Sequence, residues 1–494
     1  MEVENDDEVE VQWKDDVDAR SSGSSGEESI SKQARKEFDR PEYKEFIEIF
    51  CRPIIVRDFA IKKDATGNSK LKVSTSDDGG ARPPPKMAPT FASAIVGEWI
   101  ASKIGLGGRT PVNQDDATTS GYNKYIVNDV NILLIPGEGT LLLGPSSSGK
   151  TTLMRTLYDV IAGKISSAGK EKLEGTVHVG ATDMIHSTTE TNLSRSAAFV
   201  DQSDLTLAPI LTVEETVRFS RACADGDLDF MEESLDASFK LTGLDHVTGT
   251  VVGDSDIRGV SGGQKRRVKF LEMAVGMNIT TLFLDEVTNG LDAASAFSIC
   301  KVIREAFETI KEMGIVCLLQ PSNDVFDTFH RLILLSSNGR IVYSGKIEGA
   351  VPHFESLGLV RPEGMNIPEF LLKCASSPTD FWDQESKGTI PENISTPANI
   401  AELFLNSDAG RSLITEMDQV ATEEEENAET IKTKQQEWGR IPDYAQPFHR
   451  QIALLVGRGF KLVKRNPTTL MRVATSIILG REFLILSFRF AIVF

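Results

Sequence analysis

Short apolar runs alternate with more polar, helix-forming segments along the centre of the chain. The runs at residues 280–286, 314–320 and 331–345 are rich in aliphatic residues, which predicts buried strands. Helices are expected between them, including several up to about residue 245. Strands and helices that alternate in this way indicate an α/β fold built on a largely parallel sheet.

The same patterning divides the chain into five segments. Residues 1–45 combine an acidic block with SSGSSG, which is typical of a disordered tail. Residues 46–108 hold one strand and one amphipathic helix, and are interpreted as a folded N-terminal extension. Residues 109–350 form the α/β domain. Residues 351–439 are a helical and loop-rich linker, and residues 440–494 are basic.

The charge pattern reverses near the end of the chain. The acidic run at residues 421–430 is interpreted as a solvated part of the linker. Basic residues then interleave with apolar ones, which predicts a helix on the cytoplasmic face of a membrane. These residues are Arg450, Arg458, Lys461, Lys464 and Arg465. The following LMRVATSIILG starts like a membrane span, but Arg481, Glu482 and Arg489 interrupt it, so we expect an incomplete first transmembrane segment.

Composition narrows the class of protein. The formal net charge of −19 argues against nucleic-acid binding, because gripping phosphates requires a dense basic face. The five cysteines show no CxxC spacing, which favours reduced thiols over a metal site or a disulfide framework. The acidic first residues do not resemble a secretory signal.

The stretch GPSSSGKTT fits the pattern GxxxxGK[ST] and lies between an apolar strand and a helix, as a phosphate-binding loop requires. Its residues are Gly144, Pro145, Ser146, Ser147, Ser148, Gly149, Lys150, Thr151 and Thr152. The glycines let consecutive N–H groups point at phosphate oxygens. Lys150 supplies a positive charge for the outer phosphates of ATP, and the Thr151 hydroxyl is a ligand for Mg²⁺.

Acidic and amide residues at two strand ends complete this candidate site. Asp285, at the end of an apolar strand, is suited to hold Mg²⁺, and Glu286 to polarise the attacking water. Gln202 follows another predicted strand, where it is placed to contact Mg²⁺ or water. The candidate catalytic residues are therefore Glu286, Gln202 and Lys150, and the candidate metal ligands are Thr151, Asp285 and Gln202.

A second phosphate cradle is predicted in VSGGQKRRV. Ser261, Gly262 and Gly263 precede a predicted helix, so a hydroxyl, backbone N–H groups and the helix dipole converge there. The chain already has one cradle. Two cradles in one domain make sense if this one closes over a nucleotide that a second domain holds.

These motifs, in this order, resemble the ATP-binding cassette (ABC) family. The stretches LLLGPSSSGKTTL, DIRGVSGGQKRRV, LLQPSNDVFDTFHRLILLSSNGRIVYSG and KRNP resemble the first nucleotide-binding domain of full-size pleiotropic drug resistance transporters of the G subfamily. The resemblance covers about residues 53–480. It implies a P-loop NTPase (RecA-like) core with an antiparallel β-subdomain and a helical subdomain that carries the signature loop. It also implies head-to-tail dimers with a second nucleotide-binding domain, in cis or in trans.

By the same resemblance, residues 261–264 are the signature loop, Gln202 is the Q-loop glutamine, and Leu291 and Asp292 lie on the loop that crosses the dimer. Tyr125, at a suitable distance before the phosphate loop, is a candidate to stack on adenine, with ordinary packing as the equal alternative. Tyr122 is the weaker candidate.

One position departs from the family pattern. ABC domains usually place histidine immediately before the dipeptide that is here Gln320-Pro321, and this chain has Leu319. An alkyl group donates no hydrogen bond to the γ-phosphate, so hydrolysis at this pocket is expected to be weak. His330 is interpreted as a surface residue rather than a substitute.

The leading interpretation is therefore the ATP-binding domain of a membrane transporter. We expect it to hydrolyse MgATP on the cytoplasmic side of the membrane, to act with a transmembrane domain, and to drive export of lipophilic compounds. The alternatives are a regulatory form that dimerises with an intact transporter, and a soluble ABC ATPase that rearranges other macromolecules. Because residues 481–494 leave the family pattern, a fragment, a gene-model error and a short isoform are each consistent with the sequence.

Overall fold

The structure is a computed structural model of the chain. The residues that the structure describes are 41–62, 125–165, 169, 172–186, 196–201, 207–224, 235–236, 238–240, 242–274, 279–382, 391, 394–438, 446–466, 471 and 475. The predicted acidic tail up to residue 40, the predicted helix of the N-terminal extension and the predicted transmembrane segment lie outside the described residues, apart from isolated positions.

A six-stranded sheet forms the centre of the domain, in the order β10-β9-β3-β8-β7-β6. Its strands are β3 (Gly139–Leu143), β6 (Ala197–Val200), β7 (Thr281–Asp285), β8 (Met313–Cys317), β9 (Arg331–Leu335) and β10 (Ile341–Lys346). All neighbouring pairs are parallel except β9 and β10. Strands β3, β7 and β8 are buried along their whole length, as their continuous aliphatic sequences predict. The predicted α/β fold is confirmed.

A second sheet of four antiparallel strands lies beside the first, in the order β2-β1-β4-β5. These strands are β1 (Ile54–Lys62), β2 (Tyr125–Leu134), β4 (Leu173–Val179) and β5 (Thr182–Asp183). Strand β1 pairs with both β2 and β4. The predicted boundary between residues 46–108 and 109–350 therefore does not separate two folded units, because β1 is an inner strand of the domain's own sheet.

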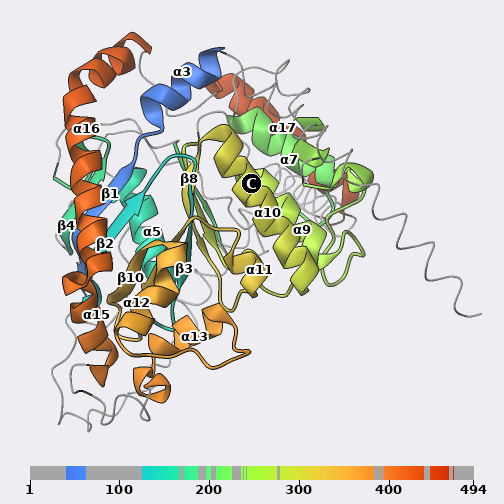
Figure 1. Cartoon of the computed structure of the whole chain (residues 1–494). Helices are drawn as coiled ribbons and strands as arrows, with labels where there is room; N and C mark the ends of the chain where they lie inside the picture. The colour runs from blue at the N-terminus through green and yellow to red at the C-terminus, as the bar shows by residue number, and fades with distance from the viewer. Residues whose placement is uncertain are drawn as a thin grey trace, which may run out of the picture.

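Helices cover the central sheet and extend one side of it. They are α3 (Pro41–Phe50), α5 (Lys150–Ile161), α7 (Val213–Ala224), α9 (Gly262–Ala274), α10 (Ala293–Ile310), α11 (Asn323–Phe326), α12 (Ala350–Ser356), α13 (Ile367–Cys374), α15 (Pro397–Asn406), α16 (Asp408–Trp438) and α17 (Phe448–Arg465), with short 3₁₀ turns η3 (Asp245–Val247), η4 (Ile347–Gly349) and η5 (Pro378–Phe381). The main core joins both sheets with α5, α10, α13 and α15. A separate, smaller core lies between α7 and α9. Figure 1 shows α7, α9 and α17 grouped on one side of the molecule.

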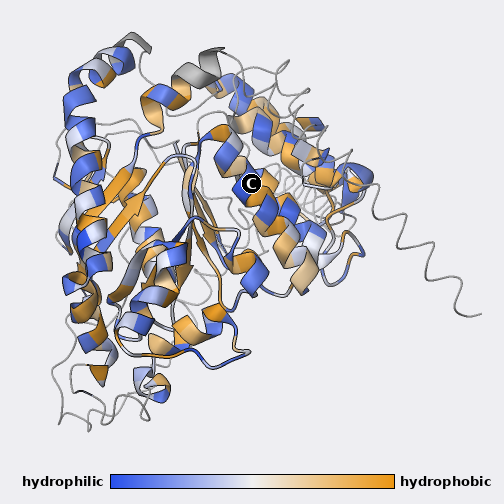
Figure 2. Cartoon of the chain, in the orientation of Figure 1, coloured by the Kyte–Doolittle hydropathy of each residue, from blue (hydrophilic) through white to orange (hydrophobic). Residues whose placement is uncertain are grey.

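Helix α16 contains residues 421–430, the acidic run that was interpreted as a solvated part of the linker, and most of these residues are exposed. The acidic run belongs to a single helix of 31 residues that passes along the antiparallel sheet (Figure 1), and it is largely hydrophilic on the side in view (Figure 2). Glu424 is 6 % exposed and pairs with Arg52, whose Nε lies 2.8 Å from Glu424 Oε2. The fully buried guanidinium of Arg331 binds both carboxylate oxygens of Glu416 at 3.0 and 2.7 Å. These distant partners hold the acidic helix against the domain.

Helix α17 occupies part of the predicted basic segment and packs beside α7 (Figure 1). Its side chains include large exposed apolar ones, among them Phe448, Val456 and Phe460. Leu454 instead packs against the smaller core. Among the described helices, none combines the length and apolarity needed to cross a bilayer.

Candidate functional site

The carboxyl ends of the parallel strands bring the predicted site residues to one edge of the central sheet. The phosphate loop follows β3, Asp285 ends β7, and Leu319 follows β8. The strands are in register, since Asp285 pairs with Cys317 and Leu142 pairs with Cys317 from the other side. In open α/β sheets this edge is where ligands bind. We refer to residues 144–152 with Asp285 and Glu286 as the phosphate-loop half-site.

Two positions in the loop require glycine, because a side chain there would clash with neighbouring atoms. Gly149 has a φ of +93°, in the left-handed region, and an added Cβ would lie 2.8 Å from Val127 Cγ2. An added Cβ at Gly144 would lie 2.9 Å from the Leu335 carbonyl oxygen and from Ser148 Oγ. Ser147 also has a positive φ, of 64°. Left-handed turns of this kind point successive N–H groups inward, which makes a cradle for an anion.

Lys150 is the first residue of α5 and is 6 % exposed. Its Nζ donates hydrogen bonds to the carbonyl oxygens of Gly144 at 2.7 Å and Pro145 at 2.8 Å. The ammonium group therefore lies across the loop, where it adds positive charge to the N-terminus of α5. This is the placement that binding of outer phosphate groups requires.

Thr151 and Asp285 are brought together from α5 and β7. The Thr151 hydroxyl donates to Asp285 Oδ2 at 2.8 Å. Burial raises the pKa of Asp285 above its usual value, and the hydrogen bond from Thr151 opposes this shift. Asp285 Oδ1 is buried and accepts no hydrogen bond within the described part of the chain. A hydroxyl beside a carboxylate with an unused oxygen fits Mg²⁺, which prefers oxygen ligands and would neutralise phosphate charge.

Glu286 follows Asp285 with a φ of 52°, a conformation that non-glycine residues adopt rarely and that is common at functional sites. Its N–H donates to the Cys317 carbonyl oxygen at 3.0 Å. Its Oε2 accepts a hydrogen bond of 3.3 Å from Asn289 Nδ2. The main chain thus holds Glu286 at the sheet edge, as the predicted role of polarising water requires.

Leu319 stands at the same edge with 40 % of its surface exposed. The preceding N–H, of Leu318, bonds to the Leu142 carbonyl oxygen at 3.4 Å, which keeps this segment beside β3. His330 lies at the opposite, amino end of the strands. Its Nδ1 accepts from Gly139 N–H at 3.1 Å, and its Nε2 lies 3.1 Å from Glu308 Oε1. His330 is half-buried and is too far along the sheet to replace the missing phosphate contact.

The signature half-site, residues 261–264, opens α9. Ser261 Oγ accepts from Gln264 N–H at 3.2 Å, and Gln264 Oε1 accepts from Ser261 N–H at 3.0 Å, which is a reciprocal capping box. The loop borders an open depression of about 520 Å³ that His246, Arg267 and Asp292 also line. The structure therefore brings the predicted signature loop and the predicted dimer-crossing loop to one depression.

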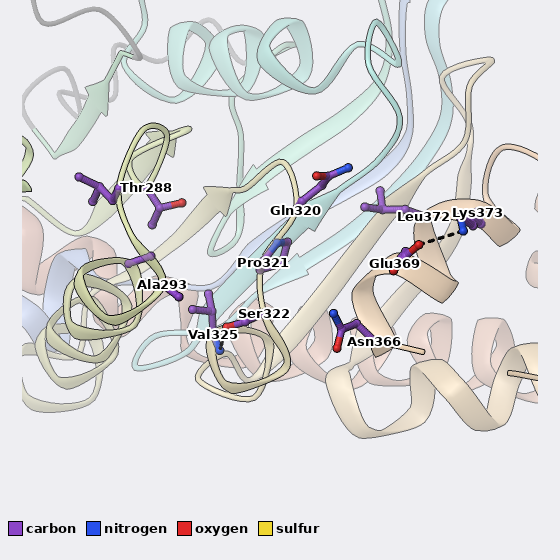
Figure 3. A pocket seen from close by; sticks show the side chains of 12 residues that line it. Thr288, Ala293, Gln320, Pro321, Ser322, Val325, Asn366, Glu369, Leu372 and Lys373 are labelled. Atoms are coloured by element: carbon purple, nitrogen blue, oxygen red, sulfur yellow. Dashed lines mark hydrogen bonds and ion pairs between the residues drawn. The ribbon is translucent and has the colours of Figure 1, made fainter. Parts of the chain in front are cut away.

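A second hollow, of about 660 Å³, lies beside the Leu319 segment. In Figure 3, Thr288 and Ala293 stand on one side and the α13 residues Glu369 and Lys373 on the other, with residues 320–322 between them. Glu369 and Lys373 form an ion pair of 2.9 Å. Sequence reasoning did not single out α13, because its apolar spacing is that of an ordinary packed helix.

The remaining predicted residues have different outcomes. Tyr125 begins β2, opposite Lys62, and its hydroxyl donates to Glu174 Oε2 at 2.9 Å. Gln202 and Tyr122 lie outside the described residues. Sequence reasoning missed His246, whose Nε2 lies 3.2 Å from Gln264 Nε2. The signal that could have found it is weak, because the two residues are 18 positions apart.

Comparison with known proteins finds matches for two consecutive parts of the chain. A family model described as ABC transporter matches residues 127–289, and one described as ABC-2 type transporter matches residues 319–388. The chain is 30 % identical to ABC transporter G family member 35 of Oryza sativa subsp. japonica over 377 residues. The aligned region covers 69 % of this chain and 24 % of the relative. It is 33 % identical over 324 residues to pleiotropic drug resistance protein 1 of Nicotiana tabacum, covering 58 % and 22 %. With ABC transporter G family member 31 of Arabidopsis thaliana it shares 33 % over 328 residues, covering 59 % and 22 %.

The chain thus spans about a quarter of the length of these curated relatives. The matches identify the α/β domain as an ABC ATPase domain similar to those of G-family and pleiotropic drug resistance transporters. The range matched by the second model begins at Leu319 and includes β9, β10 and the helices up to η5.

Proposed function

We propose that this chain is the first nucleotide-binding domain of a membrane transporter of the pleiotropic drug resistance type, and that it binds MgATP to drive export of lipophilic compounds. The observation that carries the proposal is the convergence of Lys150, Thr151 and Asp285 at the sheet edge. Lys150 and the loop N–H groups would hold the phosphates. Thr151, Asp285 and Gln202 would hold Mg²⁺, which supplies neutralisation of the phosphate charge.

The phosphate-loop half-site is further proposed to be the weaker of two composite sites. Glu286 is present to polarise water, whereas Leu319 offers no hydrogen-bond donor to the γ-phosphate. The signature half-site is complete and is closed by its capping box. Each domain of a head-to-tail pair lends its signature to the other domain. This chain would then turn over ATP slowly itself and serve a more active site on its partner.

Contacts between α7 and α17 support the proposed coupling to a membrane. Glu215 Oε2 accepts from the Thr212 N–H at 3.1 Å, which caps the start of α7. The same carboxylate binds Lys461 at 3.2 Å and Arg465 at 2.5 and 3.0 Å. A helix with an exposed apolar face, which suits a membrane surface or a transmembrane domain, is thereby tied to the helical part of the cassette.

Equilibrium titration of a fluorescent ATP analogue onto the full chain tests the proposed nucleotide site. The full chain is necessary because β1 belongs to the domain's own sheet. We expect Mg²⁺-dependent binding that Lys150→Ala weakens about 10- to 100-fold, since a charge-assisted contact is lost. Lys434→Ala, which removes an exposed ion pair with Glu48, is the matched control. Equal affinity of Lys150→Ala and the unmodified chain would refute the assignment.

A further inference from the structure

We propose that His246 is a positioning residue for the signature half-site: it holds the Gln264 side chain in the orientation that keeps the Ser261 loop closed. The inference rests on the proposed function, because a signature loop acts on nucleotide that a second domain holds. His246 lies in η3, on a separate segment from α9, and reaches the loop through its imidazole ring.

The hydrogen-bond pattern fixes which way the Gln264 amide must point. Its Oε1 accepts from the Ser261 N–H at 3.0 Å, so the amide nitrogen faces away from the loop. That nitrogen lies 3.2 Å from His246 Nε2. An amide nitrogen carries only N–H donors, so His246 Nε2 must be the acceptor and the ring proton must be on Nδ1.

The neighbour of His246 agrees with this tautomer. Asp245 Oδ1 lies 3.8 Å from His246 Nδ1, which is too long for a hydrogen bond but places negative charge beside the protonated nitrogen. If Gln264 turned over, its oxygen would face His246 and its N–H₂ group would face the Ser261 N–H. Two donors would then oppose each other, and the reciprocal capping box would be lost.

The position of the pair links it to nucleotide handling. His246, Ser261, Gly262, Gly263 and Gln264 all line the same depression of about 520 Å³. The side chain of His246 is 61 % exposed there. In the proposed head-to-tail pairing, the partner's nucleotide would face this depression. A loop held in advance meets phosphate without further ordering, which lowers the barrier rather than improving initial binding.

Three substitutions of the full chain separate positioning from general structure. His246→Ala removes the acceptor, His246→Lys offers only donors, and His246→Gln restores an acceptor oxygen at similar reach. His186→Ala is the matched control, because His186 is 63 % exposed and pairs only with Asp183 in the described residues. Hydrogen exchange measured by mass spectrometry on a peptide that begins several residues before Ser261 and includes Gln264 reports loop closure without a partner or turnover.

We expect exchange in this peptide to be about 2- to 10-fold faster in His246→Ala and His246→Lys, and unchanged in His246→Gln and His186→Ala. At a turning-over composite site, the same two variants should lower kcat for MgATP by about the same factor with KM unchanged. Exchange in His246→Ala equal to that of the unmodified chain would overturn the inference, as would equal effects of alanine and glutamine. Failure of the unmodified chain to bind ATP would instead count against the proposed function. The exchange result would still decide the role of His246, because that assay requires no nucleotide.

Discussion

The phosphate loop and the signature loop both open a helix after a glycine-rich turn, but the two are supported differently. The phosphate-loop half-site is built on the main core: Lys150 is buried, and Asp285 ends a fully buried strand. The signature half-site rests on the smaller core between α7 and α9, and its residues are mostly exposed or half-exposed. The first half-site is therefore built into the buried core, whereas the second lies at the surface, where a partner could reach it.

The largest effect is expected from placing a negative charge in the signature half-site. An added Cβ at Gly262 meets no atom within 4 Å, and a carboxylate at the start of α9 is favourable to the helix dipole. Gly262→Asp should therefore fold normally, but its charge would repel the phosphates of a nucleotide on the partner. We expect turnover of a composite site to fall about 100-fold, with ATP affinity of this chain unchanged.

Gly262→Asn is the matched control, because it has nearly the same shape without the charge. Steady-state ATPase assays together with ATP titration measure the two quantities separately. If Gly262→Asp weakened ATP binding to the same chain, the two half-sites would not be independent, and the comparison would fail.

The next effect concerns the stability of the smaller core. Glu272 on α9 is 8 % exposed, and burial raises its pKa to about 7, although Arg458 of α17 and Lys269 of α9 lower it. Between its ordinary pKa of 4.5 and about 7, the folded protein binds more protons than the unfolded chain, so stability falls as pH rises across this window. Glu272→Gln should flatten that slope and stabilise the protein by about 1–3 kcal/mol at pH 8.

Urea unfolding between pH 5 and pH 8 measures this effect, followed through probes in the α7–α9 region. Glu355→Gln, an exposed change on α12, should leave the slope as it is. An unchanged slope in Glu272→Gln would mean that this carboxylate does not titrate within the window.

A smaller effect is expected where α17 meets α7. Burial raises the pKa of Glu215, but hydrogen bonds from Arg465, the Thr212 N–H and Lys461 outweigh it and lower the pKa to about 2. The stabilisation is therefore complete above about pH 4.5 and is lost as pH falls toward 2. At neutral pH, Glu215→Gln should speed hydrogen exchange in α17 about 10-fold, because charge-assisted hydrogen bonds are lost.

Glu214→Gln is the adjacent control, since Glu214 pairs with Arg218 on its own helix. Raising the salt concentration should reduce the difference between Glu215→Gln and the unmodified chain, because the pair with α17 is partly exposed. Identical exchange in both variants would show that α17 is held by Leu454 and its apolar neighbours rather than by charge.

The sequence was most informative where function depends on local spacing. The loop at residues 144–152, Asp285 and the signature residues 261–264 follow from motifs of a few positions. It was least informative where contacts join distant segments. The inclusion of β1 in the sheet depends on pairing with β2, across more than 60 residues. The pairing of the buried Glu424 with Arg52 could not be predicted, because the two residues lie 372 positions apart.

Substitution of Leu319 tests the central claim most directly: that the phosphate-loop half-site binds MgATP but hydrolyses it weakly because Leu319 offers no donor. Single-turnover hydrolysis should be compared in the full chain, in Leu319→His and in the control Leu319→Met. We predict that Leu319→His raises the rate about 3- to 10-fold with unchanged ATP affinity, that Leu319→Met does not, and that Glu286→Gln abolishes the gain. Rapid hydrolysis by the unmodified chain that is lost in Glu286→Gln and not improved by Leu319→His would contradict the account.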